Sequence, residues 1–277
     1  MITEKNTKKE IWQAYKDLLA EKESEKKHEG ISVVIPFVSE FAQGNELQYA
    51  LRGWAENFTE NFNLVIIGDR LPWMSDDLAV INAPRESENP PIDIAAKMLK
   101  VIESDLVSEK FIWAHDDQYL ISPCHTADFE ALKCVGKLEN ADAGSVQYRR
   151  NKEATLNFLK DLEKSTWDFS THSPVVYEKQ KLKNLINRLN LTENAMLVSS
   201  LYFNLFFPGF VPYNLSGRNA LLKDNFRLGV FRREANLKLM QELMPGKKMI
   251  CNSELGWTPE LDQILNETFP EKCRYEK

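Results

Sequence analysis

Two short runs of apolar residues stand near the start of the chain, ISVVIPF at 31–37 and LVIIGD at 64–69. Their side chains are mostly β-branched and do not alternate with polar ones, which is typical of strands in a parallel sheet that is covered on both faces. Between the runs, residues 45 to about 58 repeat apolar side chains at helical spacing. This strand–helix–strand order predicts an α/β domain with a doubly wound sheet.

The same alternation continues to about residue 114. A short strand is expected at 80–82, a helix from about 92 to 104 after a Pro-Pro pair, and a strand at 111–114. The second half is less regular, and its expected elements are a strand at 143–150, helices at 152–163 and 177–189, and a broken aromatic stretch at 202–213. Residues 6–27 predict a polar surface helix.

The composition limits the class of protein. The 277 residues are 43% hydrophobic and 27% charged, as in an ordinary globular protein. The 35 Lys and Arg against 41 Asp and Glu give a formal net charge of -6, which argues against a dedicated nucleic-acid binder. No secretory leader pattern opens the sequence and no apolar run is long enough to span a bilayer, so we expect a cytoplasmic protein. The four cysteines lack metal-binding spacing and are expected to be reduced.

Carboxylates follow two of the expected strands. Asp69 ends a strand expected at 63–69, and Asp116 and Asp117 come after His115, which directly follows the strand at 111–114. Ligands of open α/β sheets bind beyond the carboxyl ends of the strands. Adjacent carboxylates repel each other unless a cation, a donor or water satisfies them, and Mg²⁺ or Mn²⁺ binds carboxylates together with substrate phosphate oxygens. The pair is therefore a candidate metal site, and the alternative is a helix N-cap or a solvated turn.

Three further side chains are candidates for the same site. His172 stands in Thr-His-Ser-Pro ahead of an expected helix, where a histidine can ligate a metal, donate to a phosphate or act as a general base. The alternative for a lone histidine is a hydrogen-bonded loop residue. Lys97 lies on the helix before the Asp pair and Arg52 on the helix at 45–58, and either can neutralise a diphosphate. The alternative for each is a solvated surface charge.

Five segments, taken in order, resemble the Stealth family of sugar-phosphate transferases. NELQYALRGW at 45–54 resembles that family's ELRYSLRS, and VIIGDRLPW at 65–73 resembles IYIVTDGQIPxW. FIWAHDDQYLISP at 111–123 resembles FLYLNDDVFL, and HSPVVYEK at 172–179 resembles HxPHLIDK. The closing LND…FPxxSxFE is matched by CNSE at 251–254 and FPEKCRYE at 269–276.

The chain departs from that family at three places. The opening WVDGSDP block is absent, Ser253 stands in place of the Asp of the closing segment, and Val175 replaces the second His of HxPH. The first strand, VVIPFVSE at 33–40, is instead similar to the VSVVIP opening of GT-A glycosyltransferases, where the nucleotide pocket begins. The resemblances imply a Rossmann-like, GT-A-type α/β fold. Its mixed, mostly parallel sheet is flanked by helices, and a helical C-terminal extension follows.

The function implied by these resemblances is a metal-dependent glycosyltransferase. It would use Mg²⁺ or Mn²⁺ and a nucleotide-diphospho-sugar, expected to be a UDP-sugar, on a glycan or surface-polymer acceptor, as in capsule or polysaccharide biosynthesis. The implied site residues are, as metal ligands, Asp116, Asp117 and His172; as donor-binding residues, Asp69, Lys97 and Arg52; and as catalytic residues, His172, Asp117 and Glu254.

The expected organisation is an N-terminal helical arm at 1–30 and a single domain at 31–277. Its nucleotide and metal half would span about 31–125 and its acceptor half about 126–277. Two alternatives stay open. One is a Stealth-type sugar-1-phosphate transferase, which releases a nucleoside monophosphate, and the other is a degenerate member that binds nucleotide-sugar or glycan without turnover. We expect no stable nucleic-acid partner and no transmembrane segment.

Overall fold

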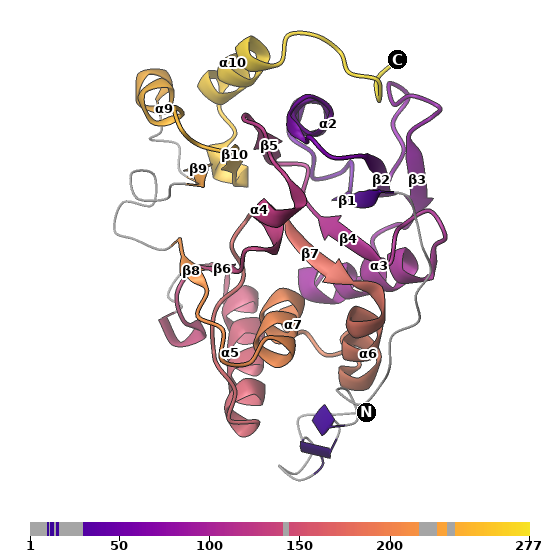
Figure 1. The fold of residues 1–277 in the computed structure, drawn as a ribbon, viewed down its shortest axis with the longest axis vertical. Coiled ribbons are helices and arrows are strands. Elements are labelled where there is room, and N and C mark those ends of the chain that lie inside the picture. The colour runs from indigo at the N-terminus through magenta and orange to yellow at the C-terminus, as the bar shows by residue number, and fades with distance from the viewer. Residues whose placement is uncertain are drawn as a thin grey trace.

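A five-stranded sheet forms the centre of the protein (Figure 1). The computed structural model describes residues 10, 12, 13, 15, 16, 30–140, 144–215, 226–231 and 236–277. The sheet order is β3-β2-β1-β4-β7. The bounds are Ala79–Asn82 for β3, Phe62–Gly68 for β2, Ile31–Phe37 for β1, Lys110–Trp113 for β4 and Val175–Glu178 for β7. The first four strands are mutually parallel and β7 is antiparallel to β4, so the sheet is mixed and mostly parallel.

Helices cover both faces of this sheet. Because successive strand residues point to opposite faces, Val34 and Val65 belong to one apolar cluster and Val33 and Ile66 to another. The first cluster includes α3 (Pro90–Glu103), α5 (Val146–Asp161), α6 (Lys179–Leu189) and α7 (Val198–Phe206). The second includes α2 (Glu46–Asn57) and α4 (Thr126–Glu130). The two layers of helices leave the strand ends as the place where polar side chains can gather.

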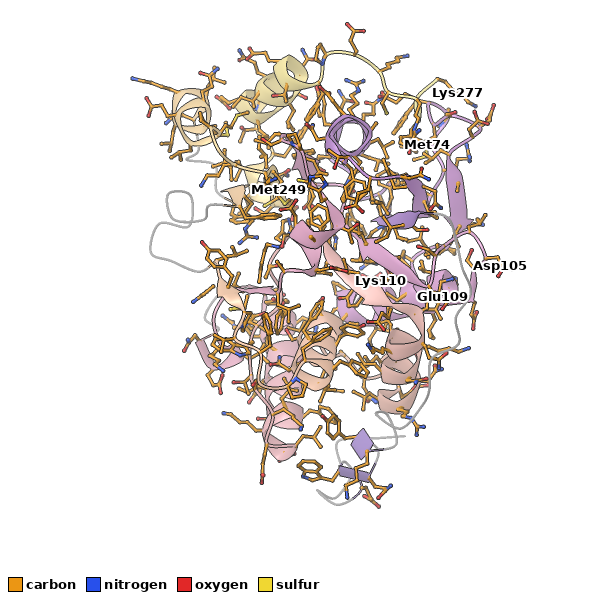
Figure 2. The ribbon with its side chains drawn as sticks, viewed as in Figure 1. Met74, Asp105, Glu109, Lys110, Met249 and Lys277 are labelled. Carbon is orange, nitrogen blue, oxygen red and sulfur yellow. The ribbon has the colours of Figure 1, made fainter. Side chains whose placement is uncertain are left out.

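A second, three-stranded sheet adjoins α2 and carries the C-terminal helices. Its order is β5-β10-β9, with bounds Gln118–Leu120, Met249–Asn252 and Arg227–Val230. Apolar side chains of α9 (Leu237–Leu243) and α10 (Pro259–Thr268) cluster with it. The chain then returns to the region of the central sheet, where Lys277 lies near Met74 (Figure 2). The short elements are β6 (Lys133–Cys134), β8 (Tyr213–Asn214), and the 3-10 turns η1 (Leu138–Asn140) and η2 (Glu254–Gly256).

The α/β class and the elements expected up to residue 114 are confirmed. The expected strands at 31–37, 63–69, 80–82 and 111–114 are β1, β2, β3 and β4, and the expected helices at 45–58 and 92–104 are α2 and α3. Each of these segments has a local signal, an apolar run for the strands or helical spacing for the helices, so local pattern was sufficient. The expected C-terminal helices are also present as α9 and α10, but the three-stranded sheet that packs with them was not predicted.

The strand expected at 143–150 is wrong, because the segment from Val146 belongs to helix α5. Gly144 has a φ of +104°, a backbone conformation that disfavours a regular strand and suits a turn. Ser145 then caps the helix, since its side chain accepts a hydrogen bond from the backbone N–H of Tyr148 at 3.1 Å. The helix expected at 152–163 is the later part of α5, and residues 141–143 lie outside the described part of the chain.

The helix expected at 177–189 begins two residues later, at Lys179. Val175–Glu178 forms β7 instead, and Tyr177 pairs with Phe111 of β4. A four-residue strand followed directly by a helix shows no alternation long enough to separate the two. The break expected within 202–213 falls after Phe206, where α7 ends.

The N-terminal arm expected at 1–30 lies mostly outside the described residues. Residues 10, 12, 13, 15 and 16 are helical, and Tyr15 donates a hydrogen bond from its hydroxyl to the backbone oxygen of Leu205 at 3.3 Å. Among the residues that the structure describes, none of the helices has the length and apolar character needed to cross a membrane.

Candidate active site

Asp116 and Asp117 lie where the two sheets meet. They follow β4 of the central sheet and precede β5 of the small sheet, so one short turn joins the two sheets. The backbone N–H of Asn252, at the end of β10, donates to the backbone oxygen of Asp117 at 3.3 Å. This contact fixes the turn against the small sheet and places both carboxyl groups at the carboxyl end of β4.

His172 is joined to this turn by a pair of short contacts. Its Nε2 lies 2.8 Å from Asp117 Oδ2 and 2.6 Å from the backbone oxygen of Asn252. A backbone oxygen can only accept, so Nε2 must carry the hydrogen and donate. In the neutral ring, Nδ1 is therefore the nitrogen with the lone pair. The arrangement of a carboxylate behind a histidine is the one that orients a general base in hydrolases.

The backbone of His172 is strained. Its φ is +50°, in the left-handed region that side chains other than glycine rarely adopt. The ring stacks on that of His115, with centroids 6.1 Å apart and planes 8° apart, and Phe231 meets it edge-on at 5.6 Å. A non-glycine residue held in this conformation costs of the order of 1 kcal/mol. The surrounding rings and the contacts of Nε2 hold the ring in place.

The two carboxyl groups differ in charge. Burial, and then the negative charge of Asp117, raise the pKa of Asp116. Burial acts in the same direction on Asp117, but the positive charge of His172 and its hydrogen bond outweigh it, so the pKa of Asp117 is lowered. Without a bound cation, the pair therefore holds Asp117 ionised and favours a proton on Asp116.

The two histidines are shifted in opposite directions. Burial lowers the pKa of His172, but the charge of Asp117 and the hydrogen bonds to Asp117 and Asn252 raise it by more, so the net shift is upward. Burial lowers the pKa of His115 to about 4, with the charge of His172 adding to this and that of Asp117 opposing it. At neutral pH, His115 is uncharged, whereas the contact with Asp117 favours a proton on His172 more than in a free imidazole.

Glu46 and Asn252 form a buried layer behind this pair. Asn252 Nδ2 donates to Glu46 Oε1 at 2.7 Å, and the Tyr119 hydroxyl donates to Asn252 Oδ1 at 2.7 Å. Burial raises the pKa of Glu46 to about 7, against the lowering effect of its hydrogen bonds to Asn252 and Gln43. Sequence reasoning did not select these residues, although both stand inside the segments that resemble the Stealth family. For Glu46, an acidic residue in the first turn of an expected helix was the available signal.

A cavity of about 420 Å³ lies beside the histidines, and His115 and His172 both line it. The first half of α3, the start of α5, the loop at 169–173, Val175 of β7 and the start of α7 also line it. Its size is within the range of small-molecule sites. The carboxyl end of β4 also reaches it through Trp113.

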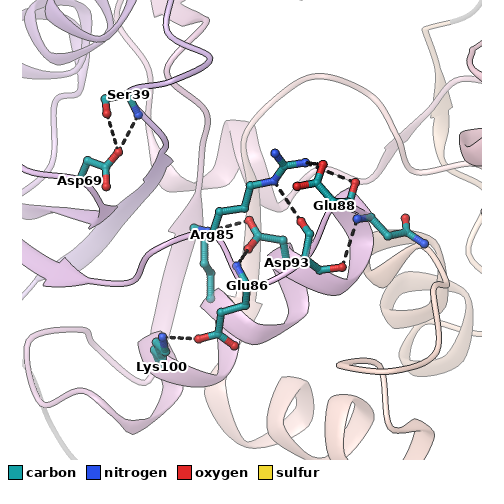
Figure 3. A network of polar contacts seen from close by, with 10 residues as sticks. Ser39, Asp69, Arg85, Glu86, Glu88, Asp93 and Lys100 are labelled. Atoms are coloured by element: carbon teal, nitrogen blue, oxygen red, sulfur yellow. Dashed lines mark hydrogen bonds and ion pairs between the residues drawn. The ribbon is translucent and has the colours of Figure 1, made fainter.

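Asp69 lies beyond the carboxyl end of β2, as expected. Its Oδ2 accepts from the backbone N–H of Ser39 at 2.8 Å and from the Ser39 hydroxyl at 2.7 Å, which joins the ends of β1 and β2 (Figure 3). Two positions after Ser39, Phe41 is 57% exposed, and the guanidinium of Arg85 lies 4.7 Å from the centroid of the Phe41 ring. Phe41 and Arg85 were not selected from the sequence.

Lys97 is buried in an ion pair within α3. Its Nζ lies 2.6 Å from Asp93 Oδ2, and Asp93 Oδ1 accepts from the backbone N–H of Glu86 at 2.7 Å. The Asp93 carboxylate thereby connects α3 to the loop that carries Arg85 and Glu86, and Lys100 pairs with Glu86 in the same network (Figure 3). Binding of a phosphate by Lys97 stays a prediction, and it would require the Asp93 contact to be exchanged.

Arg52 and Glu254 are placed differently from the residues above. Arg52 donates from Nε and NH2 to the two carboxylate oxygens of Glu276 at 2.7 and 2.8 Å, and from NH1 to the backbone oxygen of Phe269 at 2.8 Å. It therefore fastens the C-terminal segment to α2. Glu254 is exposed in η2, two residues after Asn252. Roles for Arg52 in donor binding and for Glu254 in catalysis stay predictions.

The Asp116-Asp117 pair offers two neighbouring carboxyl groups to a divalent cation. Within the described ranges, no group of three or more His, Cys, Asp or Glu side chains is arranged as a complete metal site. However, Asp117 Oδ1 is buried and has no hydrogen-bond partner among those residues, and a cation would satisfy it. Two carboxylates completed by substrate oxygens and water suit Mg²⁺ or Mn²⁺. His172 as a third ligand stays a prediction, because its Nε2 already donates to two oxygens.

No protein-family model and no curated protein matches this sequence. Among solved structures, a similar chain is the galactosyltransferase LgtC, in complex with donor and acceptor sugar analogs. The two sequences are 10% identical, and the TM-score is 0.45. The match covers 88% of this chain and 98% of that chain.

Proposed function

We propose that the protein is a glycosyltransferase that moves a sugar from a nucleotide-diphospho-sugar to a hydroxyl group of a glycan or surface-polymer acceptor. Two features that meet at one sheet edge carry the proposal. One is a carboxylate with a buried oxygen that has no partner among the described residues, and the other is the Asp117–His172 pair beside a cavity. Asp117 contributes to both, because Oδ1 is unpartnered among the described residues and Oδ2 holds His172. The GT-A-like sequence of the first strand supports the same activity.

Asp116 and Asp117 would hold Mg²⁺ or Mn²⁺. When bound, such an ion supplies positive charge that stabilises a leaving diphosphate. It would also offset the repulsion between the two carboxylates and favour loss of the proton from Asp116. The same two residues would take this role whether a glycosyl or a phosphoryl group is transferred.

His172 would act as the general base. The acceptor oxygen forms a bond to the anomeric carbon, and the bond from that carbon to the phosphate oxygen breaks, with its electron pair leaving on the nucleoside diphosphate. The hydroxyl proton passes to Nδ1 of His172, while Nε2–H stays bonded to Asp117 and Asn252. The carboxylate of Asp117 stabilises the imidazolium that results.

The nucleotide would lie across the ends of β1 and β2. Asp69 and Ser39 offer polar groups there, and the exposed ring of Phe41 is a surface on which a base can stack. Arg85, which is 26% exposed, is placed to reach a phosphate more readily than the buried Lys97. These placements support a UDP-sugar or another nucleotide-sugar without distinguishing among bases.

The test is a thermal-shift screen of nucleotide-sugars with and without Mn²⁺, followed by product analysis. A donor that binds only the native state raises the melting temperature by mass action. We expect a Mn²⁺-dependent shift with at least one donor, lost in Asp117→Asn and kept in Asp105→Asn. Asp105 is an exposed residue before the opposite end of β4 and serves as the matched control (Figure 2).

The product distinguishes the remaining alternatives. Release of a nucleoside diphosphate supports glycosyl transfer, whereas a nucleoside monophosphate would support the Stealth-type transfer of a sugar 1-phosphate that the five sequence segments suggest. Binding of a donor with neither product, in the presence of glycan acceptors, would indicate a binding protein without turnover. No shift with any donor would overturn the proposal.

A further inference from the structure

The cavity beside His172 has walls of an unusual kind for a site next to a proposed diphosphate. Apolar side chains make up much of it, including Trp113 at the end of β4, Ile94 of α3 and Val198 of α7. Tyr148 of α5 adds a second aromatic ring. Sugar rings present C–H faces that pack on such aromatic surfaces, and apolar walls favour their burial.

None of the described residues that line this cavity is Asp, Glu, Lys or Arg. The histidines that line it are His115 and His172. The ring of His172 is already engaged by a carboxylate outside the lining, because its Nε2 lies 2.8 Å from Asp117 Oδ2. A charged ligand would therefore leave water for a site that offers it no opposite charge, which is strongly unfavourable.

The polar groups in the wall are neutral and partly satisfied within the protein. The Ser199 hydroxyl lies 2.7 Å from the Tyr177 hydroxyl, and the Asn151 amide donates to Asn89 at 2.8 Å. Gln147, at the exposed start of α5, donates to Asn151 at 3.0 Å. Hydroxyl and amide groups can each make further bonds, and they match the hydroxyls of a sugar.

We infer that this cavity is the acceptor site, and that it takes an uncharged glycoside with an apolar face and excludes phosphorylated, uronate or sialylated sugars. The assignment of the cavity to the acceptor rests on the proposed glycosyl transfer. The selection against charged ligands depends only on the residues that line the cavity. The nucleotide-sugar, which carries the negative charge, lies outside the cavity at the ends of β1 and β2. The acceptor hydroxyl then reaches His172 from the cavity side.

The first experiment compares two ligands that differ in one charge, phenyl β-D-glucopyranoside and phenyl β-D-glucuronide. Dissociation constants for the full chain are measured by ligand-observed NMR titration. We expect the glucoside to bind at least about tenfold more tightly than the glucuronide. Equal affinities, or no binding of the glucoside at about 50 mM, would overturn the inference, since weak small ligands bind in the millimolar range.

A charge added at the rim should change this preference. Gln147 is exposed and lines the cavity, so Gln147→Lys places a cation there without burying it. We expect the preference for the glucoside to narrow by about fivefold or more, since opposite charges attract more strongly beside a low-dielectric wall. Gln241→Lys, at an exposed position of α9 outside the cavity lining, is the matched control and should leave the ratio unchanged. Equal effects of the two variants would contradict the location.

A bulky side chain should fill the cavity. Ile94→Trp is expected to weaken glucoside binding at least about tenfold, while Leu99→Trp, at a half-buried position of the same helix outside the cavity lining, should not. If Ile94→Trp fails to fold, the Gln147 variant still tests the site. Unchanged glucoside binding in a folded Ile94→Trp protein would overturn the inference.

The donor distinguishes failure of this inference from failure of the proposed function. If a nucleotide-sugar still raises the melting temperature but displaces the glucoside competitively, the cavity holds the donor, and the acceptor assignment is wrong while the transferase stands. If no nucleotide-sugar binds and the glucoside does, the transferase is wrong, and the selection for a neutral glycoside stands alone. Simultaneous binding of both supports the two proposals together.

Discussion

Glu46 and Asn252 lie 206 positions apart in the chain, yet the Asn252 amide donates a 2.7 Å hydrogen bond to the buried carboxyl group of Glu46. The same asparagine accepts from Tyr119 through its side chain and from His172 through its backbone oxygen. Asn252 thus connects the first turn of α2 to the proposed base. Glu46 touches none of the proposed reacting atoms, so its role would be positioning.

The first prediction concerns the pH dependence of stability. Burial raises the pKa of Glu46 from 4.5 to about 7, so between these values the folded chain binds more protons than the unfolded chain. This group's contribution to the unfolding free energy therefore falls as pH rises from 4.5 to 7, by up to about 3 kcal/mol. We expect Glu46→Gln, which cannot ionise, to gain stability relative to the wild type over that window.

Urea unfolding of both proteins at pH 4.5, 6 and 8 measures this difference. Glu56→Gln, at an exposed position of the same helix, is the matched control and should change the unfolding free energy by no more than about 0.5 kcal/mol at any pH. A Glu46→Gln difference that does not vary with pH would contradict the prediction. A rise in its KM or a shifted pH–rate profile, with the fold intact, would support the positioning role.

The second prediction concerns the Asp117–His172 pair. The charge of Asp117 and two hydrogen bonds raise the pKa of His172 despite its burial, so the imidazolium is favoured above the ordinary value of 6.5. This stabilisation is fully present below 6.5 and is lost as pH rises through the higher folded value. In metal-free protein, Asp117→Asn should lower the pKa of His172 by about one unit or more. Proton NMR titration of the ring measures it.

Asp105→Asn is the control for that titration, since this exposed residue precedes the opposite end of β4. An unchanged His172 pKa in Asp117→Asn would mean that the charge of Asp117 does not affect the titration of His172. In activity assays, the wild type should lose kcat/KM as pH falls through the His172 pKa, because Nδ1 then carries a proton.

The parts of the fold and site that sequence could predict are those with a local signal. β1 and β2 carry apolar runs of their own, and the Asp116-Asp117 pair follows closely after β4. His172 was selected from its loop and a family resemblance, and the structure places it 2.8 Å from Asp117, 55 positions earlier. The parallel strands β1, β2 and β4 bring their carboxyl ends to one edge, and the antiparallel β7 begins at that edge just after the His172 loop.

The parts that could not be predicted depend on contacts between distant segments. Asn252 reaches Glu46 because β10 pairs with β5, and no periodic pattern in the sequence predicts that three-stranded sheet. Within the segment at 251–254, the sequence pattern favours Glu254 as a candidate and gives no sign of Asn252. Similarly, nothing local to Arg52 indicates that Glu276 will fold back onto it.

The third prediction tests the strained backbone of His172, whose φ is +50°. Glycine adopts this region without a steric penalty, whereas alanine does not. We expect His172→Gly to be more stable than His172→Ala by up to about 1 kcal/mol, although glycine has the more flexible unfolded state. Chemical denaturation of the two variants gives the comparison, and neither retains the imidazole.

Ser173 provides the reference, because its φ is not in the positive region. There both replacements lose the 2.7 Å contact between the hydroxyls of Ser173 and Thr171, and alanine should be the more stable of the two. The same order at both positions would show that the His172 backbone relaxes when its ring is removed.

The last prediction separates structure from donor binding at Arg52. The Arg52–Glu276 pair is nearly inaccessible, with 12% and 1% of the two side chains exposed. Arg52→Gln would leave the Glu276 carboxylate buried without its cation, at a cost of about 3 kcal/mol in unfolding free energy. The double variant Arg52→Met with Glu276→Leu removes both charges and should lose less. Arg150→Gln, at an exposed position of α5, should change stability by no more than about 0.5 kcal/mol.

Donor binding gives the second readout for the same proteins. Every nitrogen of Arg52 has a partner in the C-terminal segment, so the Mn²⁺-dependent thermal shift produced by a nucleotide-sugar should keep its size in a folded Arg52→Gln protein. A lower baseline melting temperature with an unchanged ligand shift supports the structural role. If the ligand shift disappears while the baseline stays the same, Arg52 binds the donor, and the ion pair with Glu276 must open when it does.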